Sequence, residues 1–423
     1  MTATNDNATV DAASAKTAWR PIHASVVSKR TVNPIRRIVD NLNVVPNAAK
    51  PVISLALGDP TVFGNLSTHR TSIEAMEEAM QKPQTHGYAP SIGFEVARAA
   101  IAAHHSTPEA PLTSGDVVIA SGCSGALDLC ITALANEGDE ILVPQPGFSL
   151  YETLATSKGI GCQYYRLRPE QHWEADLEHM ATLITPRTRA IVINNPSNPC
   201  GSVYTRAHLL DLLAFCERHQ LPIIADEIYC DLVFSGHTFH PMATLTTSVP
   251  ILAVGGLAKK YLVPGWRLGW ILIHDRHQRL QEIRTALNSL SQLIIGANTV
   301  VQMALPKILA DTPPSFHADT IRLLEKHAEL SATCLSGIPG LTVVVPQGAM
   351  YMMVGIKPEA FADIPNDLVF TERLMAEESV FCLPGQCFGY PNYFRIVYTA
   401  PEDKLREAYD RIRAFVERHR SKC

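Results

Sequence analysis

The chain has 423 residues with a formal net charge of -5, and 46% of its residues are hydrophobic while 18% are charged. This composition is typical of a globular protein with more than one domain. The negative charge argues against nucleic-acid binding, and no membrane span is expected, since no run of about 18 apolar residues occurs.

The ten cysteines are scattered along the chain without Cys-x-x-Cys or zinc-finger spacing. No metal site is therefore predicted, and free thiols in a reducing, cytoplasmic compartment are expected. Residues 1–32 are rich in Ala, Thr, Ser and Asn and lack the apolar core of a secretory signal. They are interpreted as a disordered tail, with mitochondrial targeting as the alternative.

Ordered structure is expected from Asn33, which can cap a helix that holds Pro34 in its first turn. Further along, short apolar runs that are typical of buried strands alternate with helical patterns. The runs are 116–122, 140–147, 162–169, 189–196, 222–229, 250–259 and 268–275, and the clearest helical patterns are 124–138 and 206–220. This alternation predicts an α/β fold with a mostly parallel, seven-stranded sheet covered on both faces.

After about residue 330 the pattern changes to the segments 340–356, 378–385 and 393–400, followed by an amphipathic helix at 401–419. This order predicts a smaller α+β domain. We assign residues 33–60 and 331–423 to this domain, and residues 61–330 to the larger one.

Polar residues collect where four predicted strands end, and ligands of open α/β sheets bind at the carboxyl ends of strands. The ends are "IASGCS", "VINNPSNPCG", "IIADEIYC" and "PILAVGGLAKK". In the first, the amides of Gly122, Cys123 and Ser124 would begin a helix and form an anion site. The last carries Lys259 to the end of a buried strand, where a bare ammonium would cost several kcal/mol.

These strand ends suit pyridoxal phosphate, which needs a lysine for its Schiff base and an acid for its ring nitrogen. The cofactor also needs donors to its phenolate oxygen, a phosphate cradle and an aromatic ring against its face. The candidates are Lys259, Asp226, Tyr229 with Asn198, the "SGCS" turn with Arg267, and Phe148.

The chain resembles the fold-type I, class I aminotransferases over residues 33–420. The resemblance rests on the order and spacing of "GYAPSIG", "SGCS", "NNPSNPCG", "ADEIY", "AKKYLVPGWRLGW" and "YFRIVYT". It implies that Lys259 is the catalytic Schiff-base lysine and that Lys260 is its solvent-facing neighbour. Asp226 would then hold the proton of the ring nitrogen, and Tyr229 would donate to the phenolate oxygen, which Asn198 shares.

The same resemblance implies that Arg267 binds the phosphate, while Tyr88 reaches the phosphate of the partner subunit in a homodimer. Arg395, with Asn198, would bind the substrate carboxylate, and Gly58 would let the backbone approach the substrate closely.

Two positions depart from the wider family. Gly256 stands where many relatives have Ser or Thr, and the thiol of Cys123 is a poor donor, so backbone amides and Ser124 would carry more of the phosphate binding.

Within the family, segments such as "GDPTVFGNL" and "GAMYMMVGI" look most like members that act on tyrosine. The resemblance therefore implies amino transfer from L-tyrosine, and other aromatic amino acids, to 2-oxoglutarate. The products would be 4-hydroxyphenylpyruvate and L-glutamate, as in the first step of tyrosine catabolism. No arginine is clearly placed for a second substrate carboxylate.

Other functions stay open at this point. An aminotransferase of alanine or kynurenine, or a carbon–sulfur lyase, could use the same fold. A ligand-sensing regulator is a more distant alternative, disfavoured because neither the first 32 residues nor the charge balance indicates a DNA-binding module.

Overall fold

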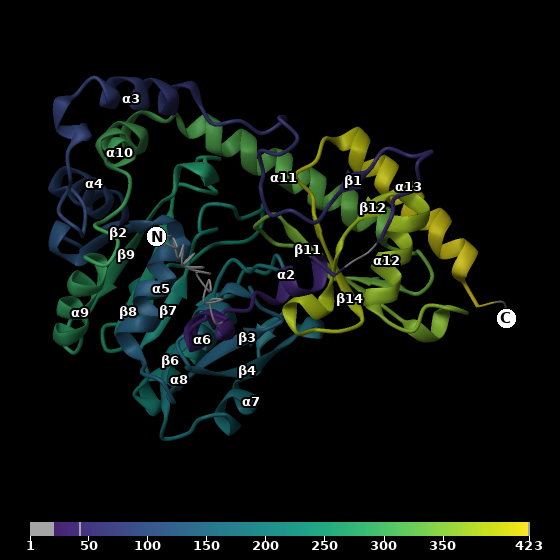
Figure 1. Cartoon of the computed structure of the whole chain (residues 1–423), viewed down its shortest axis with the longest axis horizontal. Coiled ribbons are helices and arrows are strands. Elements are labelled where there is room, and N and C mark those ends of the chain that lie inside the picture. The colour runs from purple at the N-terminus through teal and green to yellow at the C-terminus, as the bar shows by residue number, and fades with distance from the viewer. Residues whose placement is uncertain (1–20, 42–43, 422–423) are drawn as a thin grey trace, which may run out of the picture.

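A computed structural model describes residues 21–41 and 44–421. Its larger part is built on an eight-stranded sheet, at the left and centre of Figure 1, in the order β2-β9-β8-β7-β6-β3-β4-β5. The strands are β2 (Val117–Ser121), β3 (Glu140–Gln145), β4 (Gly161–Arg168), β5 (Glu174–Ala175), β6 (Thr188–Asn194), β7 (Ile223–Asp226), β8 (Ile251–Gly256) and β9 (Leu268–His274). All seven predicted strands are present, and β5 is an eighth that was not predicted.

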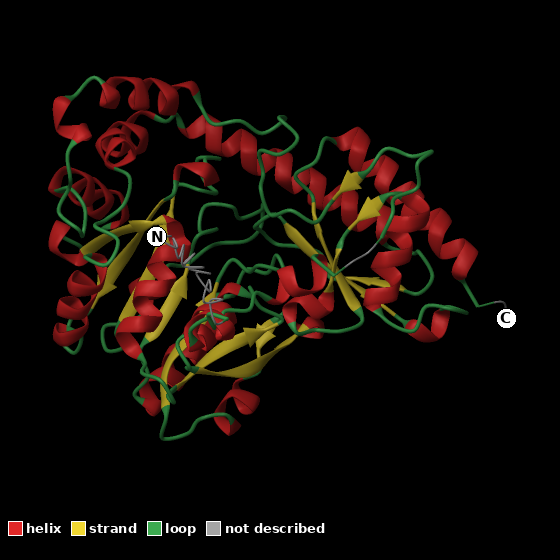
Figure 2. Cartoon of the chain, in the orientation of Figure 1, coloured by secondary structure: helices red, strands yellow, loops and turns green. Residues whose placement is uncertain are grey.

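The five strands from β8 to β4 run parallel, while β9, β2 and β5 pair antiparallel with their neighbours. Helices cover both faces, as Figure 2 shows. One face packs against α5 (Gly122–Leu134), α6 (Leu150–Ser157) and α9 (Gln281–Ser291). The other packs against α4 (Glu95–His105), α7 (Leu177–Thr182), α8 (Arg206–His219) and α10 (Thr299–Asp311), and α3 (Arg70–Met80) packs on α10. Burial on both faces explains why these strands read as continuous apolar runs.

The smaller part, at the right of Figure 1, has an antiparallel sheet in the order β10-β11-β14-β13. Its strands are β10 (Leu341–Val343), β11 (Tyr351–Ile356), β13 (Leu383–Pro384) and β14 (Tyr393–Val397), and β1 (Ile53–Ser54) pairs separately with β12 (Val380–Phe381). The helices of this part are α11 (Pro314–Leu335), α12 (Asp367–Glu378) and α13 (Glu402–His419). The boundary assigned between residues 330 and 331 falls inside α11, which packs along α13 through side chains such as Leu324.

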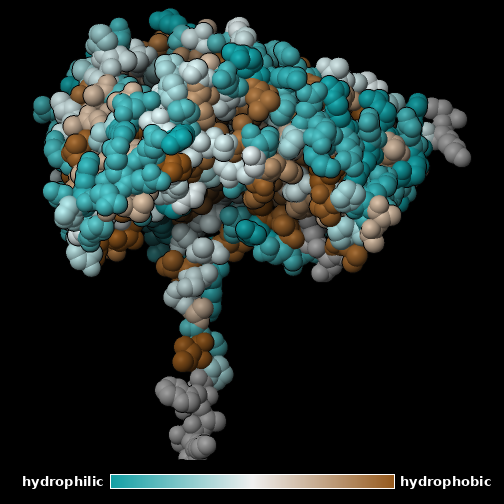
Figure 3. Space-filling model, turned by 90° about the horizontal axis from the view of Figure 1, so that it is seen from above, coloured by the Kyte–Doolittle hydropathy of each residue, from teal (hydrophilic) through white to brown (hydrophobic). Residues whose placement is uncertain are grey.

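The N-terminal prediction needs a correction, because part of the segment 1–32 is helical; residues 1–20 lie outside the described residues. Helix α1 (Val26–Arg30) lies beside α6, and Arg30 forms an ion pair with Glu137 at 2.6 Å. The segment that leads into α1 projects from the body of the molecule, and apolar side chains gather near its base (Figure 3). Helix α2 (Pro34–Val39) begins as predicted, with Asn33 Oδ1 accepting a hydrogen bond from the amide of Arg36.

Within the described residues, no helix combines the length and the apolar composition that crossing a membrane would require. The nine described cysteines, from Cys123 to Cys387, are free thiols.

Candidate active site

A cavity of about 340 Å³ opens between the two parts of the molecule, at the carboxyl ends of β6, β7 and β8. Loop 56–59, the start of α5 and strands β11 and β14 complete its wall. The cavity brings together most of the predicted site residues: Gly58, Cys123, Ser124, Phe148, Asn198, Asp226, Tyr229, Lys259, Arg267 and Arg395. Strand ends that are far apart in the sequence thus meet in one place, as parallel topology requires.

Lys259 follows β8 and its ammonium group points into this cavity. Its Nζ donates a hydrogen bond to the carbonyl oxygen of Gly58 at 2.7 Å and lies 5.7 Å from the ring centroid of Tyr229. Lys259 has no ion pair within the described part of the chain. An amine in this setting is free to bond to a ligand in the cavity.

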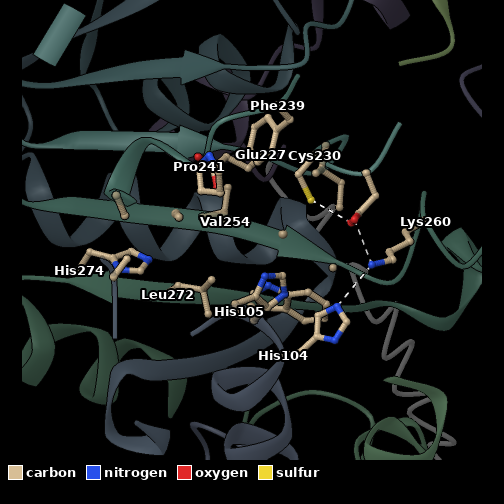
Figure 4. A pocket seen from close by; sticks show the side chains of 18 of the residues that line it. His104, His105, Glu227, Cys230, Phe239, Pro241, Val254, Lys260, Leu272 and His274 are labelled. Carbon is tan, nitrogen blue, oxygen red and sulfur yellow. Dashed lines mark hydrogen bonds and ion pairs between the residues drawn. The ribbon is translucent and has the colours of Figure 1, made fainter. Parts of the chain in front are cut away.

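Lys260 lies away from the cavity, although the sequence placed it next to Lys259 in solvent. Only 17% of its side chain is exposed, its Nζ forms an ion pair with Asp231 at 3.1 Å, and His104 lies 3.4 Å from it. The prediction of a solvent-facing lysine is therefore wrong. Figure 4 shows this lysine at a second, smaller cavity of about 70 Å³.

The second cavity holds buried titratable groups on the opposite face of the sheet from α5. Burial raises the pKa of Glu227 to about 7, although the amide of Met242 donates to its carboxylate. The Nε2 atom of His105 is buried without a hydrogen-bond partner. Among the residues that the structure describes, no group of three or more His, Cys, Asp or Glu could hold a metal ion.

Asp226 ends β7 with its carboxylate directed into the main cavity, and only 2% of the residue is exposed. Burial raises the pKa of Asp226, while hydrogen bonds oppose the shift. The carboxylate accepts from the hydroxyl of Tyr151 at 2.6 Å and from the amide of Ile228 at 3.3 Å. The thiol of Cys123 lies 3.7 Å from Oδ1. A buried carboxylate whose donors are mainly neutral is suited to a cationic ligand.

Tyr151 was missed by the sequence analysis, which stopped at Phe148 three residues earlier. Both residues line the cavity, and their rings meet edge to face with centroids 5.8 Å apart. A signal was present, because Tyr151 follows closely on the predicted strand 140–147, and the other site residues also lie after the carboxyl ends of strands.

The predicted phosphate end of the cavity lies where α5 begins. Gly122 has a φ of +70°, and a Cβ there would lie 2.5 Å from an Nη atom of Arg267, so this close approach requires glycine. Arg267 Nη1 donates to the carbonyl of Pro264 at 2.9 Å. The side chain of Ser124 also faces the cavity, whereas the thiol of Cys123 is directed to Asp226. Helix terminus and guanidinium together are suited to an anion.

Arg395 reaches the cavity from β14 and is only 4% exposed. Its Nη1 donates to Asn198 Oδ1 at 3.0 Å and its Nη2 to the carbonyl of Ala56 at 2.6 Å, while its Nε is buried without a partner. Burial lowers the pKa of Arg395, and no carboxylate pairs with it within the described residues. A buried guanidinium with an unused N–H is suited to a carboxylate ligand.

Tyr88 lies apart from these residues. It is 89% exposed and does not line the cavity of its own chain. Any role at a site would require a second subunit.

The residues present fit pyridoxal phosphate. Lys259 would bond to the cofactor, Asp226 would face the ring nitrogen, and Arg267 with the start of α5 would hold the phosphate. Asp226 and Arg395, a buried carboxylate and a buried guanidinium, both line this cavity, and neither forms an ion pair within the described residues. The two groups lie on different elements, which is the arrangement needed for a cationic ring and an anionic substrate.

Comparison with known proteins identifies the family of the chain. The family model "Aminotransferase class I and II" matches residues 50–412. The chain is 54% identical to tyrosine aminotransferase of Mus musculus over 96% of this chain and 89% of that protein. It is 53% identical to tyrosine aminotransferase of Homo sapiens over the same shares. Among solved structures, tyrosine aminotransferase from Leishmania infantum superposes with a TM-score of 0.92 at 37% identity, covering 96% of this chain and 100% of that one.

Proposed function

The chain belongs to the class I and II aminotransferases, and we propose that it transfers the amino group of L-tyrosine to 2-oxoglutarate. It is a pyridoxal-phosphate-dependent enzyme. In the proposed reaction, L-tyrosine gives 4-hydroxyphenylpyruvate and 2-oxoglutarate gives L-glutamate. Other aromatic amino acids are proposed as further donors. The reaction would be the first step of tyrosine catabolism.

The chain's own residues divide the work of this reaction. When bound, pyridoxal phosphate supplies a carbonyl carbon that takes up the amino group and a ring that withdraws electrons from the substrate α carbon. Asp226 keeps the ring nitrogen protonated. Arg395 holds the α-carboxylate and so orients the α C–H bond. Lys259 Nζ would act as the general base that takes the proton from the substrate α carbon, and as the general acid that gives this proton to the cofactor's carbonyl carbon.

The main support for an aromatic substrate is that part of the cavity wall is apolar. Ile35, Leu57 and Leu383 line it, and within the described residues its only cations are Lys259, Arg267 and Arg395. All three cations have roles at the cofactor or the α-carboxylate. An uncharged, aromatic donor side chain therefore fits the apolar part of this wall.

A panel of donors tests the proposal. Tyrosine, phenylalanine, tryptophan, methionine, alanine and aspartate would be assayed with 2-oxoglutarate, and kcat/KM compared. We expect tyrosine to exceed alanine and aspartate by about tenfold or more, since burying an aromatic ring is worth several kcal/mol. A wide preference for alanine or aspartate would contradict the tyrosine proposal and leave the family assignment intact.

Replacing Arg395 with lysine should weaken the binding of every carboxylate substrate. Lysine keeps the positive charge but lacks the planar guanidinium. Its single ammonium nitrogen cannot donate to Asn198 and form two parallel hydrogen bonds to a carboxylate at the same time. We expect kcat/KM for both tyrosine and 2-oxoglutarate to fall about 30-fold or more. Arg406→Lys, at an exposed pair with Glu402 on α13, is the matched control. Unchanged kcat/KM in Arg395→Lys would remove its role as the carboxylate ligand.

We propose that the enzyme is a homodimer in which Tyr88 reaches the phosphate of the partner's cofactor. Support comes from an exposed apolar surface made by Tyr88, Leu293, Ile294 and Ile295. The segments 88–91 and 293–296 are adjacent, because a Cβ at Gly296 would lie 3.0 Å from the carbonyl oxygen of Ser91. Exposed apolar groups of this kind mark interaction surfaces.

Mixed dimers test the role of Tyr88. Tyr88→Phe should raise the Kd for the cofactor about tenfold, since a charge-assisted hydrogen bond is lost. A dimer of one Lys259→Ala subunit and one Tyr88→Phe subunit would contain one complete site if Tyr88 acts across the interface. That site should bind cofactor as tightly as the parent does. If both sites of the mixed dimer bound cofactor weakly, Tyr88 would not act on the partner's cofactor.

We also propose a cytoplasmic location, supported by the free thiols of nine cysteines, which suit a reducing compartment. Fractionation of cells would test it, and recovery of the protein in mitochondria would favour targeting by the first residues instead.

A further inference from the structure

Tyr351 lies at the centre of the site, although the sequence assigned it no role. It is the first residue of β11, is 1% exposed, and lines the main cavity. Its side chain meets three groups with different tasks: the hydroxyl of Tyr229, the guanidinium of Arg395 and the backbone of Gly58. These groups come from three separate segments of the chain.

Strand register brings Tyr351 to Arg395. Tyr351 pairs with Val397 and Met353 pairs with Arg395 in the antiparallel ladder of β11 and β14. Tyr351 and Arg395 are thus diagonal neighbours on one face of the sheet. The guanidinium carbon of Arg395 lies 4.7 Å from the ring centroid of Tyr351 and 4.8 Å from that of Phe388. Aromatic rings at this distance attract a guanidinium and restrict its orientation.

The hydroxyl of Tyr351 meets the hydroxyl of Tyr229. The two oxygens are 2.7 Å apart, and the rings stand at 88° to one another. Each hydroxyl carries a single proton. If the proton of Tyr229 is donated to the cofactor's phenolate oxygen, the hydrogen bond between the tyrosines must use the proton of Tyr351. Burial, with Tyr351 beside it, raises the pKa of Tyr229 well above its ordinary value, so that Tyr229 keeps its proton.

Gly58 shows how closely the hydroxyl is held. A Cβ at Gly58 would lie 2.8 Å from the hydroxyl oxygen of Tyr351, so only glycine allows this approach. The carbonyl of the same glycine accepts a hydrogen bond from Lys259 Nζ. Tyr351 therefore packs against the segment that touches the lysine.

We propose that Tyr351 is a positioning residue: its hydroxyl directs the proton of Tyr229 to the cofactor oxygen, and its ring holds Arg395 for the substrate carboxylate. The inference rests on the proposed function only for the identity of the substrate. One side chain of the smaller part thereby couples cofactor binding to carboxylate binding.

Two substitutions separate the two tasks. Tyr351→Phe keeps the ring and removes the hydroxyl. In the holoenzyme, the pH midpoint of the bound cofactor's absorbance change should rise by about half a unit or more, because a weaker donor stabilises the phenolate less. The Kd for 3-phenylpropionate, an unreactive carboxylate, should stay within about twofold of the parent. Tyr351→Leu removes the ring, and should raise that Kd about fivefold or more.

The matched control is Tyr409→Phe, because Tyr409 is equally buried but bonds to Ser331 away from the cavity. It should leave both the midpoint and the Kd unchanged. In a Tyr229→Phe background, Tyr351→Phe should cause no further shift of the midpoint, since its effect passes through the hydroxyl of Tyr229.

An unchanged midpoint in Tyr351→Phe, or an equal shift in the Tyr229→Phe background, would overturn the inference. An unchanged Kd for 3-phenylpropionate in a folded Tyr351→Leu variant would overturn the role of the ring. Should this variant fail to fold, the absorbance titrations of Tyr351→Phe would still decide the role of the hydroxyl. Those titrations need no substrate, so failure of the inference is distinguishable from failure of the tyrosine proposal, which the donor panel decides separately.

Discussion

Lys259→Ala is expected to lower transamination by on the order of 10⁴-fold or more, because the variant loses both the covalent anchor and the proton carrier. The measured quantities would be kcat with tyrosine and 2-oxoglutarate, and the cofactor fixed to the chain by borohydride. We expect no fixed cofactor in the variant. The geometry leads to this result, since Lys259 Nζ points into the cavity and bonds only to the carbonyl of Gly58 within the described residues.

Lys260→Ala is the matched control, one residue along the chain. Its ammonium pairs with Asp231 on the far side of the sheet, so turnover and cofactor fixation should stay close to those of the parent. Fixation of the cofactor in Lys259→Ala, at Lys260 or elsewhere, would contradict the assignment.

Asp226→Asn is expected to lower kcat by two orders of magnitude or more while the cofactor still binds. Asparagine cannot hold the proton of the ring nitrogen as an ion pair, so the ring withdraws electrons less strongly in the transition state. Asparagine can still accept the hydrogen bond from Tyr151, which keeps the local geometry. Tyr409→Phe, a buried substitution remote from the cavity, serves as the control. Near-normal kcat in Asp226→Asn would mean that this carboxylate is not the partner of the ring nitrogen.

Asp226→Asn should stabilise the cofactor-free protein, although it lowers kcat. Burial raises the pKa of Asp226, so the folded state binds the proton more tightly than the unfolded state does. Stability therefore falls as the pH rises from the ordinary aspartate pKa of 3.8 through the raised folded-state pKa, because over this range the unfolded state loses the proton more readily than the folded state does. Asp226→Asn should raise the free energy of unfolding at pH 8, with a difference that shrinks toward the ordinary aspartate pKa of 3.8. Denaturant unfolding at several pH values measures it.

The sequence predicted the strands well where burial on both faces gave continuous apolar runs, as in β6 and β7. It missed β5, because two residues carry no periodicity. It also missed helix α1. The five residues of this helix are all exposed, and Arg30 links it to the rest of the chain through an ion pair with Glu137. Elements of two to five residues are too short for a periodic pattern to show in the sequence.

At the site, the sequence identified residues that lie at the ends of strands, since parallel topology brings those ends together. It did not identify Tyr351, whose partner Tyr229 is 122 residues away and belongs to the other part of the molecule. The predicted orientation of Lys260 was wrong because its partner, Asp231, lies in a loop whose position the sequence pattern does not reveal. Contacts that depend on how two parts meet leave no periodic signal in either one.

The central claim is that the enzyme moves the amino group of L-tyrosine to 2-oxoglutarate. The most direct test is to incubate the pyridoxal-phosphate-loaded protein with ¹⁵N-labelled L-tyrosine and 2-oxoglutarate, and to follow both products by mass spectrometry. The account predicts that 4-hydroxyphenylpyruvate and ¹⁵N-labelled glutamate form in equal amounts, and that neither accumulates beyond the enzyme concentration when 2-oxoglutarate is omitted. Release of labelled ammonia without labelled glutamate, or no product from tyrosine, would contradict it.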